Sequence, residues 1–234
     1  MNVYQIRIKI FLLKNISVDE MQTRTTYFID KMLIEHDEFQ KWHGERTYKG
    51  YCFDMPYPIP QDKVYKVQEV YTLTVRTIQP KLAQLLEEKA GKNDTREIKG
   101  LVTEMTVIPK GKHIEQIYSL TPVVLKEVGD EKNGYWRSHI TFEQYEQLIQ
   151  SNLYKKWKTF TGRDIQEEEL FQTISFINRK PISVPYKNIH LLCDKLCIHI
   201  QNTKIAQEIA YLSLGTGIGE NNGRGFGFVN YRWR

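Results

Sequence analysis

Residues Val3–Phe11 read VYQIRIKIF, and this stretch begins the pattern that decides the fold. Its isoleucines alternate with glutamine, arginine and lysine, as in a strand that buries one face. Ser17 and Glu20 follow at the spacing of a capping box, in which the two side chains satisfy amides at the start of a helix. The sequence therefore predicts a strand followed by a helix that runs towards Glu35.

The same order of elements occurs twice along the chain. The first half is expected to continue with strands over Val64–Ile78 and Leu101–Ile108, and with a helix between Pro80 and Gly91. The second half is expected to contain strands over Ile114–Lys126, Phe171–Ile177, Ile189–Ile200 and Phe228–Trp233, with helices that start at the capping box Thr141–Gln144 and at Asn202. We therefore predict an α+β fold of two tandem ferredoxin-like domains, which are RRM-like split βαβ units with antiparallel sheets, over residues 1–112 and 113–234.

The composition excludes several classes of protein. Hydrophobic residues make up 41% of the 234 residues and charged residues 26%, so we expect a packed core rather than disorder. The formal net charge of +5 permits a polyanionic partner without requiring one. Three cysteines, an odd number, favour a reducing cytoplasm. No cleavable leader and no apolar run of about 18 residues is evident, so neither secretion nor a membrane partner is expected.

The stretch Gly215–Gly227 reads GTGIGENNGRGFG and holds six of the 14 glycines. Glycines let backbone amides approach an anion closely, and Arg224 adds a guanidinium that can bind phosphate oxygens. Dinucleotide and P-loop fingerprints need a strand before the glycines and a helix after them. Here the expected order is reversed, so a nucleotide cofactor is excluded. A phosphate-binding loop and a helix C-cap that runs into a turn both remain open.

The spacing of these glycines resembles the signature of a known family. Gly217-Ile-Gly219, five residues and Gly225-Phe-Gly227 is similar to the glycine-hydrophobic-glycine motif near the C-terminus of the Cas6 family, CRISPR-associated endoribonucleases of the RAMP superfamily. Trp42-His43, followed by Lys49 and the short aromatic stretch Tyr51–Phe53, is similar to the histidine, lysine and strand of the same family. The length and the two expected domains agree with this resemblance.

The resemblance implies cleavage of a CRISPR precursor transcript (pre-crRNA) within its repeats, without a metal or another cofactor. In that reaction the ribose 2′-hydroxyl attacks the neighbouring phosphorus, which leaves a 2′,3′-cyclic phosphate and a 5′-hydroxyl. It needs groups that move two protons and a positive charge near the phosphorane. His43 is expected to be the general acid or base and Lys49 the stabilising cation. Tyr27 is the nearest candidate for the tyrosine that the family often adds, with Phe28 as the alternative in register.

RNA contacts are expected at the glycine-rich stretch, through Gly217, Gly219, Gly223, Arg224, Gly225 and Gly227. The segment Tyr154–Arg163 interleaves four basic residues with aromatic ones. Lys155 and Lys158 are predicted to contact phosphates there, and an amphipathic helix end with solvated lysines is an equal alternative. Arg232 adds positive charge on the last strand.

Other partners and another function remain open on this resemblance. The expected partner is CRISPR repeat RNA, and further subunits of a CRISPR effector complex or a second copy of the chain are additional candidates. The alternative function is that of a catalytically inactive RNA-binding subunit of an effector complex.

His36 precedes His43 by seven residues, which is about two helical turns. Further helical turns are expected up to Trp42-His43, with Gly44 as the stop, and a continuous helix would then place both histidines on one face. His36 is accordingly either a second RNA-contacting histidine or a solvated residue in an acidic patch.

A zinc interpretation involves His190, Cys193, Cys197 and His199. Their spacing matches no common zinc finger, and alternation along a strand turns His190 away from the other three. We therefore predict no metal site.

Overall fold

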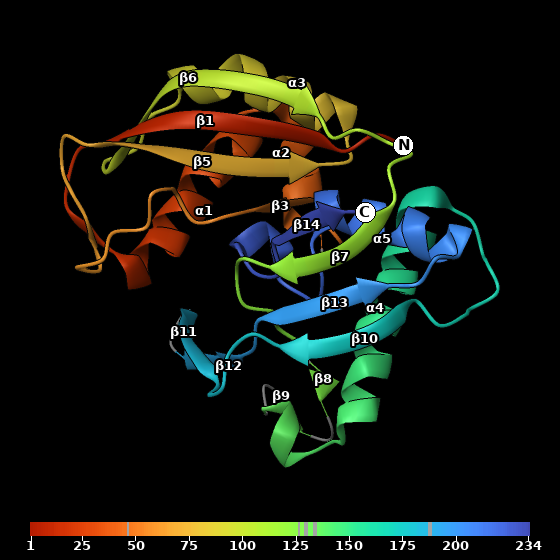
Figure 1. Cartoon of the computed structure of the whole chain (residues 1–234). Coiled ribbons are helices and arrows are strands. Elements are labelled where there is room, and N and C mark those ends of the chain that lie inside the picture. The colour runs from red at the N-terminus through yellow and green to blue at the C-terminus, as the bar shows by residue number, and fades with distance from the viewer. Residues whose placement is uncertain (46, 126, 129–130, 133–134, 187–188) are drawn as a thin grey trace. The chain divides into compact units, whose positions relative to one another are not determined.

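The structure is a computed structural model that describes residues 1–234 except residues 46, 126, 129–130, 133–134 and 187–188 (Figure 1). It divides into two compact units. The first consists of Met1–Ile108 together with Gly223–Gly225, and the second of Pro109–Asn222 and Phe226–Arg234. The chain thus leaves the first unit after Ile108 rather than after residue 112, and the tip of the glycine-rich stretch groups with the first unit.

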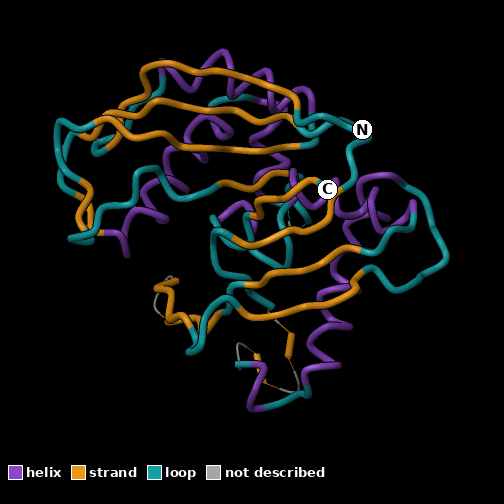
Figure 2. The backbone as a smooth tube through the Cα atoms, in the orientation of Figure 1, coloured by secondary structure: helices purple, strands orange, loops and turns teal. Residues whose placement is uncertain are grey.

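The first unit contains a four-stranded antiparallel sheet (Figures 1 and 2). Its strands, in spatial order, are β3 (Tyr51–Phe53), β5 (Val70–Thr77), β1 (Tyr4–Leu12) and β6 (Ile98–Val107). Its other elements are α1 (Val18–Ile34), α2 (Asp37–Gly44), α3 (Pro80–Lys89), the 3-10 turn η1 (Ala90–Lys92) and the paired short strands β2 (Ile16–Ser17) and β4 (Val64–Tyr65). Helix α1 follows β1 and α3 follows β5, which confirms the predicted ferredoxin-like order.

The alternating sequence of β1 supplies the core of this unit. Ile6, Ile8 and Ile10 are fully buried, and the polar residues between them lie on the opposite face of the sheet. The hydroxyl oxygen of Ser17 accepts a hydrogen bond from the amide of Glu20 at 3.2 Å, so the predicted cap starts α1.

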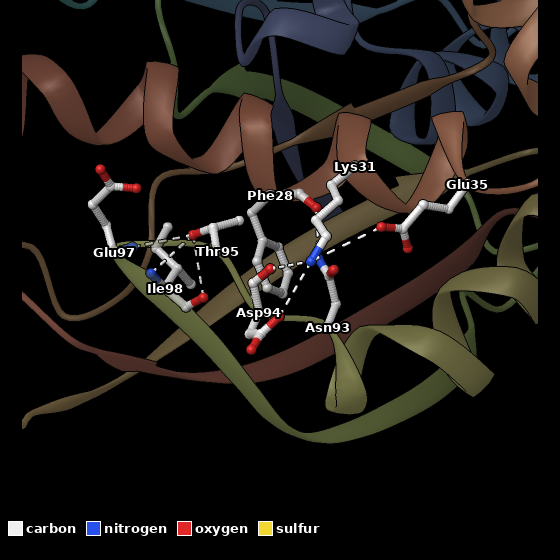
Figure 3. Close-up of polar contacts among 8 residues, drawn as sticks. All are labelled: Phe28, Lys31, Glu35, Asn93, Asp94, Thr95, Glu97 and Ile98. Atoms are coloured by element: carbon white, nitrogen blue, oxygen red, sulfur yellow. Dashed lines mark hydrogen bonds and ion pairs between the residues drawn. The ribbon is translucent and has the colours of Figure 1, made fainter.

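The C-terminal half of α1 is tied to the segment that leads into β6 (Figure 3). The side-chain amide of Asn93 donates to the carbonyl oxygen of Phe28 at 2.8 Å. The ammonium of Lys31 donates to the carbonyl oxygen of Asp94 at 2.7 Å. It also lies 3.2 Å from the carboxylate of Asp94 and 3.9 Å from the carboxylate of Glu35. Phe28 itself is fully buried. These contacts fix the helix that also contributes to the candidate site.

The helix is not continuous through His36, so the condition for placing His36 and His43 on one face is not met. Helix α1 ends at Ile34, and His36 has extended backbone angles, φ −117° and ψ 116°, at the start of the separate helix α2. Asp37 and Glu38 occupy the first turn of α2, where the helix dipole favours negative charge. His36 therefore does not share a helix face with His43.

The second unit repeats the architecture of the first (Figures 1 and 2). Its four-stranded antiparallel sheet has the spatial order β10 (Phe171–Phe176), β13 (Leu196–Ile200), β7 (Ile114–Ser119) and β14 (Val229–Trp233). Its helices are α4 (Phe142–Thr161) and α5 (Lys204–Thr216), with the 3-10 turns η2 (Trp136–Ser138) and η3 (Asn222–Arg224), the last of which runs into the first unit. Two hairpins are inserted, β8 (Glu127–Val128) with β9 (Glu131–Lys132) and β11 (Ile182–Tyr186) with β12 (Ile189–Cys193).

Three local predictions for this unit need correction. The strand expected over Ile114–Lys126 ends at Ser119, and residue 126 lies outside the described residues. The long strand expected over Ile189–Ile200 is interrupted at Asp194, whose buried carboxylate accepts hydrogen bonds from Trp136 at 2.7 Å and Asn178 at 2.7 Å. The cap of α5 is Thr203 rather than Asn202, because the Thr203 hydroxyl accepts the amide of Ala206 at 3.2 Å. The capping box of α4 at Thr141 is confirmed.

No helix in the described ranges combines the length and the apolar character that a bilayer span requires.

Candidate functional site

The first unit holds the tip of the glycine-rich stretch, Gly223–Gly225, between α1 and β3. The phenol of Tyr51 on β3 donates to the carbonyl oxygen of Gly223 at 3.3 Å, and the side-chain amide of Gln22 on α1 donates to that of Arg224 at 2.7 Å. Burial raises the pKa of Tyr51 well above its ordinary value, so the phenol keeps the proton that it donates. Helix α1 and strand β3, both from the first half of the chain, thus hold Gly223 and Arg224 by hydrogen bonds.

The glycines of this tip are required by close packing. Gly225 has a φ of +85°, which L-residues with a side chain rarely adopt. A Cβ atom there would lie 2.8 Å from the ring of Phe53 and 2.9 Å from the side chain of Gln22. A larger residue would therefore push the tip away from α1 and β3.

Arg224 pairs with Asp30 of α1. The Asp30 side chain is only 14% exposed, whereas that of Arg224 is 40% exposed, so the pair orients a guanidinium that solvent still reaches. We predicted Arg224 as a phosphate ligand from the sequence, but we did not predict its ion pair with Asp30. Asp30 is 194 residues away along the chain, and no local pattern marks it.

Lys49 closes the C-terminal end of α2. Its ammonium donates to the carbonyl oxygens of Trp42 at 2.5 Å and Glu45 at 2.7 Å, and lies 4.9 Å from the centre of the Trp42 ring. Burial lowers the pKa of Lys49, and the nearby charge of Arg224 lowers it further, while Glu45 and Asp30 oppose the shift. The charge of Arg224, at the tip of the glycine-rich stretch, therefore contributes to the lowered pKa of Lys49.

His43 lies in the last turn of α2, next to the Trp42 carbonyl that Lys49 binds. The structure describes its backbone but not its side chain, so its role stays a prediction. Tyr27 on α1 is 58% exposed, and within the described residues its side chain has no hydrogen bond, ion pair or ring contact. Phe28, the alternative in register, belongs to the core. A catalytic role for Tyr27 also stays a prediction.

The glycines of the motif that belong to the second unit serve close packing of the backbone. Gly217 follows α5 with a φ of +71°. A Cβ atom on Gly219 would lie 2.5 Å from the carbonyl oxygen of Val124, and one on Gly227 would lie 1.9 Å from that of Ile218. These glycines therefore allow two chain segments to approach closely.

Several amides of this stretch already have acceptors. The amide of Ile218 donates to Gly227 at 2.9 Å, that of Glu220 to Val124 at 2.7 Å, and that of Gly227 to Pro122 at 2.8 Å. Phosphate binding through the backbone would thus depend on other amides of the motif, and the expected RNA contacts of these glycines stay predictions.

Helix α4 sorts its basic and aromatic residues as an amphipathic helix does. Tyr154 and Trp157 are buried, so neither offers a face for base stacking. Lys155 and Lys158 are exposed, and Lys158 lies 2.7 Å from Asp164. Lys156, which lies between these two lysines in the sequence, is fully buried, and we did not predict its burial. Arg232 is exposed on β14, and the RNA contacts expected of Lys155, Lys158 and Arg232 stay predictions.

The residues of the zinc interpretation do not form a site. His190 and Cys193 lie on β12, while Cys197 and His199 lie on β13. Burial raises the pKa of the Cys193 thiol to about 12. Across the described residues, no group of three or more His, Cys, Asp or Glu side chains is placed to hold a metal ion.

Comparisons with known proteins agree with this architecture. The family model "CRISPR associated protein Cas6, C-terminal" matches residues 103–231. A solved structure described as a CRISPR associated protein Cas6 is 16% identical, with a TM-score of 0.72 over 98% of this chain and 99% of that one. A RAMP protein described as binding different RNA substrates is 17% identical, with a TM-score of 0.74 over the same shares.

A third structure, of a Cas6-related gene from Pyrococcus furiosus, is 17% identical, with a TM-score of 0.69 over 98% of both chains. A search of curated protein sequences gives no match. At such identities the solved structures establish the fold, whereas the match of the family model covers more than half of the sequence.

Proposed function

This chain belongs to the Cas6 family, whose members process CRISPR repeat RNA, and on that premise we propose that it cleaves pre-crRNA within the repeats without a metal. The ribose 2′-hydroxyl attacks the adjacent phosphorus, and the products carry a 2′,3′-cyclic phosphate and a 5′-hydroxyl. The observation that carries this proposal lies in the first unit. There the tip of the glycine motif packs against α1 and β3, with Arg224 in electrostatic reach of Lys49 beside the end of α2.

In this proposal His43 moves a proton as general acid or base, because an imidazole titrates near neutral pH. Lys49 stabilises the charge that develops on the phosphorane. Its pKa is lowered mainly by burial, and a cation that has lost part of its hydration acts more strongly on a nearby anion than a fully solvated one. Tyr27 is the third catalytic candidate that mutagenesis should test.

Repeat RNA is the proposed partner, bound through phosphate contacts that do not depend on base identity. Arg224, Lys155, Lys158 and Arg232 supply exposed or half-exposed positive charge. The RAMP protein of similar fold is described as binding different RNA substrates, which supports the same class of ligand here. The prokaryotic cytoplasm is the compartment proposed for this reaction.

The test is an incubation of the purified protein with end-labelled repeat RNA in excess EDTA. We expect cleavage at one position in each repeat and a cyclic phosphate on the upstream product. A matched RNA with a single 2′-deoxy substitution at the cut site should remain intact, because the attacking group is missing. Cleavage that requires Mg²⁺, or that survives the 2′-deoxy substitution, would contradict the mechanism.

One observation favours the alternative of an inactive RNA-binding subunit. The ammonium of Lys49 already donates to two carbonyl oxygens of the α2 end, as a helix cap does. In that case the same incubation would show a stable complex with intact RNA.

A further inference from the structure

Lys156 is a fully buried lysine in the second unit that the mechanism above does not use. It lies on α4 between two exposed lysines, and its ammonium donates to the carbonyl oxygen of Gly217 and to the side-chain oxygen of Asn222, both at 2.7 Å. Burying an ammonium is costly unless strong hydrogen bonds compensate. Gly217 and Asn222 both belong to the glycine-rich stretch.

Asn222 uses both ends of its side chain inside that stretch. Its amide nitrogen donates to the carbonyl oxygens of Ile218 at 2.9 Å and Phe226 at 3.0 Å, while its oxygen accepts from Lys156. A Cβ atom on Gly217 would lie 2.6 Å from this nitrogen. Asn222 therefore fills the centre of the loop, and the loop closes around it.

A second contact repeats the arrangement one helical turn earlier. Asn152 precedes Lys156 by four residues, so both side chains leave the same face of α4. The side-chain amide of Asn152 donates to the carboxylate of Glu220 at 3.2 Å. One face of α4 thus holds the loop at residues 217, 220 and 222.

We propose that Lys156 is a positioning residue for RNA binding, which sets the conformation of the glycine-rich loop through Asn222 without touching RNA itself. This inference rests on the proposed function for the RNA, and on the contacts of the second unit for the loop. The hydrogen bonds from a buried ammonium to two oxygens are directional. They therefore fix the loop more tightly than an apolar side chain of the same length would.

The test compares Lys156→Met with Lys204→Met, which removes an exposed lysine of the same unit. Methionine keeps an unbranched side chain that is one atom shorter than that of lysine, and it removes the hydrogen bonds of the ammonium. For Lys156→Met we expect repeat RNA to bind about tenfold more weakly, because two buried oxygens lose the ammonium that donates to them and the loop loses its fixed shape. Lys204→Met should bind RNA within about twofold of the parent.

The salt dependence of binding separates positioning from direct contact. A lysine that contacts a phosphate contributes about one unit to the slope of log K against log salt. Lys156→Met should leave this slope unchanged, whereas a slope that falls by about one would overturn the proposal in favour of direct phosphate contact. Wild-type affinity in a folded Lys156→Met variant would also overturn it.

Hydrogen exchange provides a readout that does not depend on RNA. The amide of Ile218 donates to Gly227 inside the loop, and those of Glu220 and Gly227 donate to the neighbouring segment Pro122–Val124. These amides should exchange faster in Lys156→Met, while those of β7 and β13 keep their protection. Uniform loss of protection would show a general stabilising role and would contradict the proposal. Failure of the wild-type protein to bind repeat RNA would refute the proposed function and leave the exchange result standing.

If Lys156→Met does not fold, Asn222→Ala takes its place, because it leaves the charge of Lys156 in the protein. It should give the same loss of RNA affinity with the same unchanged slope. If both variants fold, a double-mutant cycle applies. The double variant should then lose no more affinity than either single variant, because the two side chains act as one unit.

Discussion

The guanidinium of Arg224 meets two demands that usually fall to different residues. It pairs with the largely buried Asp30 and so holds the loop tip on α1, while 40% of its side chain is exposed. A planar guanidinium can satisfy both demands because its several N–H donors point in fixed, divergent directions. Loss of Arg224 should therefore change both the stability of the tip and its attraction for RNA.

Two substitutions separate these roles. Arg224→Ala should weaken binding of repeat RNA and lower the slope of log K against log salt by about one, because a phosphate contact is lost. Asp30→Asn keeps the cation and breaks the ion pair, so the slope should stay unchanged while the melting temperature falls. Salt titrations and thermal unfolding of both variants measure this. An Arg224→Ala variant with the parental slope would restrict Arg224 to holding the tip.

At the scale of elements, α2 connects backbone capping with the proposed chemistry. The ammonium of Lys49 binds two carbonyl oxygens at the C-terminal end of the helix, where the dipole favours a cation. His43 lies in the same last turn. Lys49 therefore holds the C-terminal end of α2, where His43 lies. Loss of the Lys49 proton should change both the conformation and the charge of this helix end.

The alkaline limb of the cleavage rate tests this helix end. Because the pKa of Lys49 is lowered, its ammonium should lose its proton at a pH below the ordinary lysine value of about 10.4. Loss of positive charge should slow the reaction, so the rate should fall as pH rises through that lowered pKa. Lys49→Arg should remain active to higher pH, because a guanidinium keeps its proton.

The rates are measured at saturating RNA after subtraction of uncatalysed cleavage. Lys81→Arg, at an exposed lysine that pairs with Glu38 on the surface, serves as the control and should keep the parental pH profile. Identical alkaline limbs for the parent and Lys49→Arg would remove Lys49 from the chemistry and leave it as a cap.

At the scale of the whole molecule, the predictable features are those with local causes. The alternation in β1 and the caps at Ser17 and Thr141 act within a few residues, so strands, helices and their ferredoxin-like order follow from the sequence. The tip of the glycine-rich stretch is held by two contacts of Arg224, one with Asp30 and one with Gln22. The partners are separated by 194 and 202 positions along the chain, so no local sequence pattern indicates these contacts. Lys156 was missed for a related reason, because lysines are usually exposed and only tertiary packing buries this one.

The division of the chain into two units predicts a division of kinetic effects. The proposed proton-transfer group, His43, belongs to the first unit, and the exposed lysines of α4, Lys155 and Lys158, belong to the second. His43→Ala should lower kcat by about 10²–10⁴-fold and leave RNA affinity within about twofold, because a proton-transfer group stabilises the transition state rather than the bound RNA.

The double substitution of Lys155 and Lys158 by Met should do the reverse. We expect weaker binding and a salt slope lower by about two, with kcat at saturating RNA within about twofold of the parent, because phosphate contacts hold the substrate without moving protons. Lys204→Met is the matched control and should change neither quantity. Single-turnover rates and equilibrium binding, measured on the same preparations, separate the two effects. If His43→Ala weakened binding as much as it slowed cleavage, the histidine would belong to the RNA-binding surface, and proton transfer would have to come from another residue, with Tyr27 the first to test.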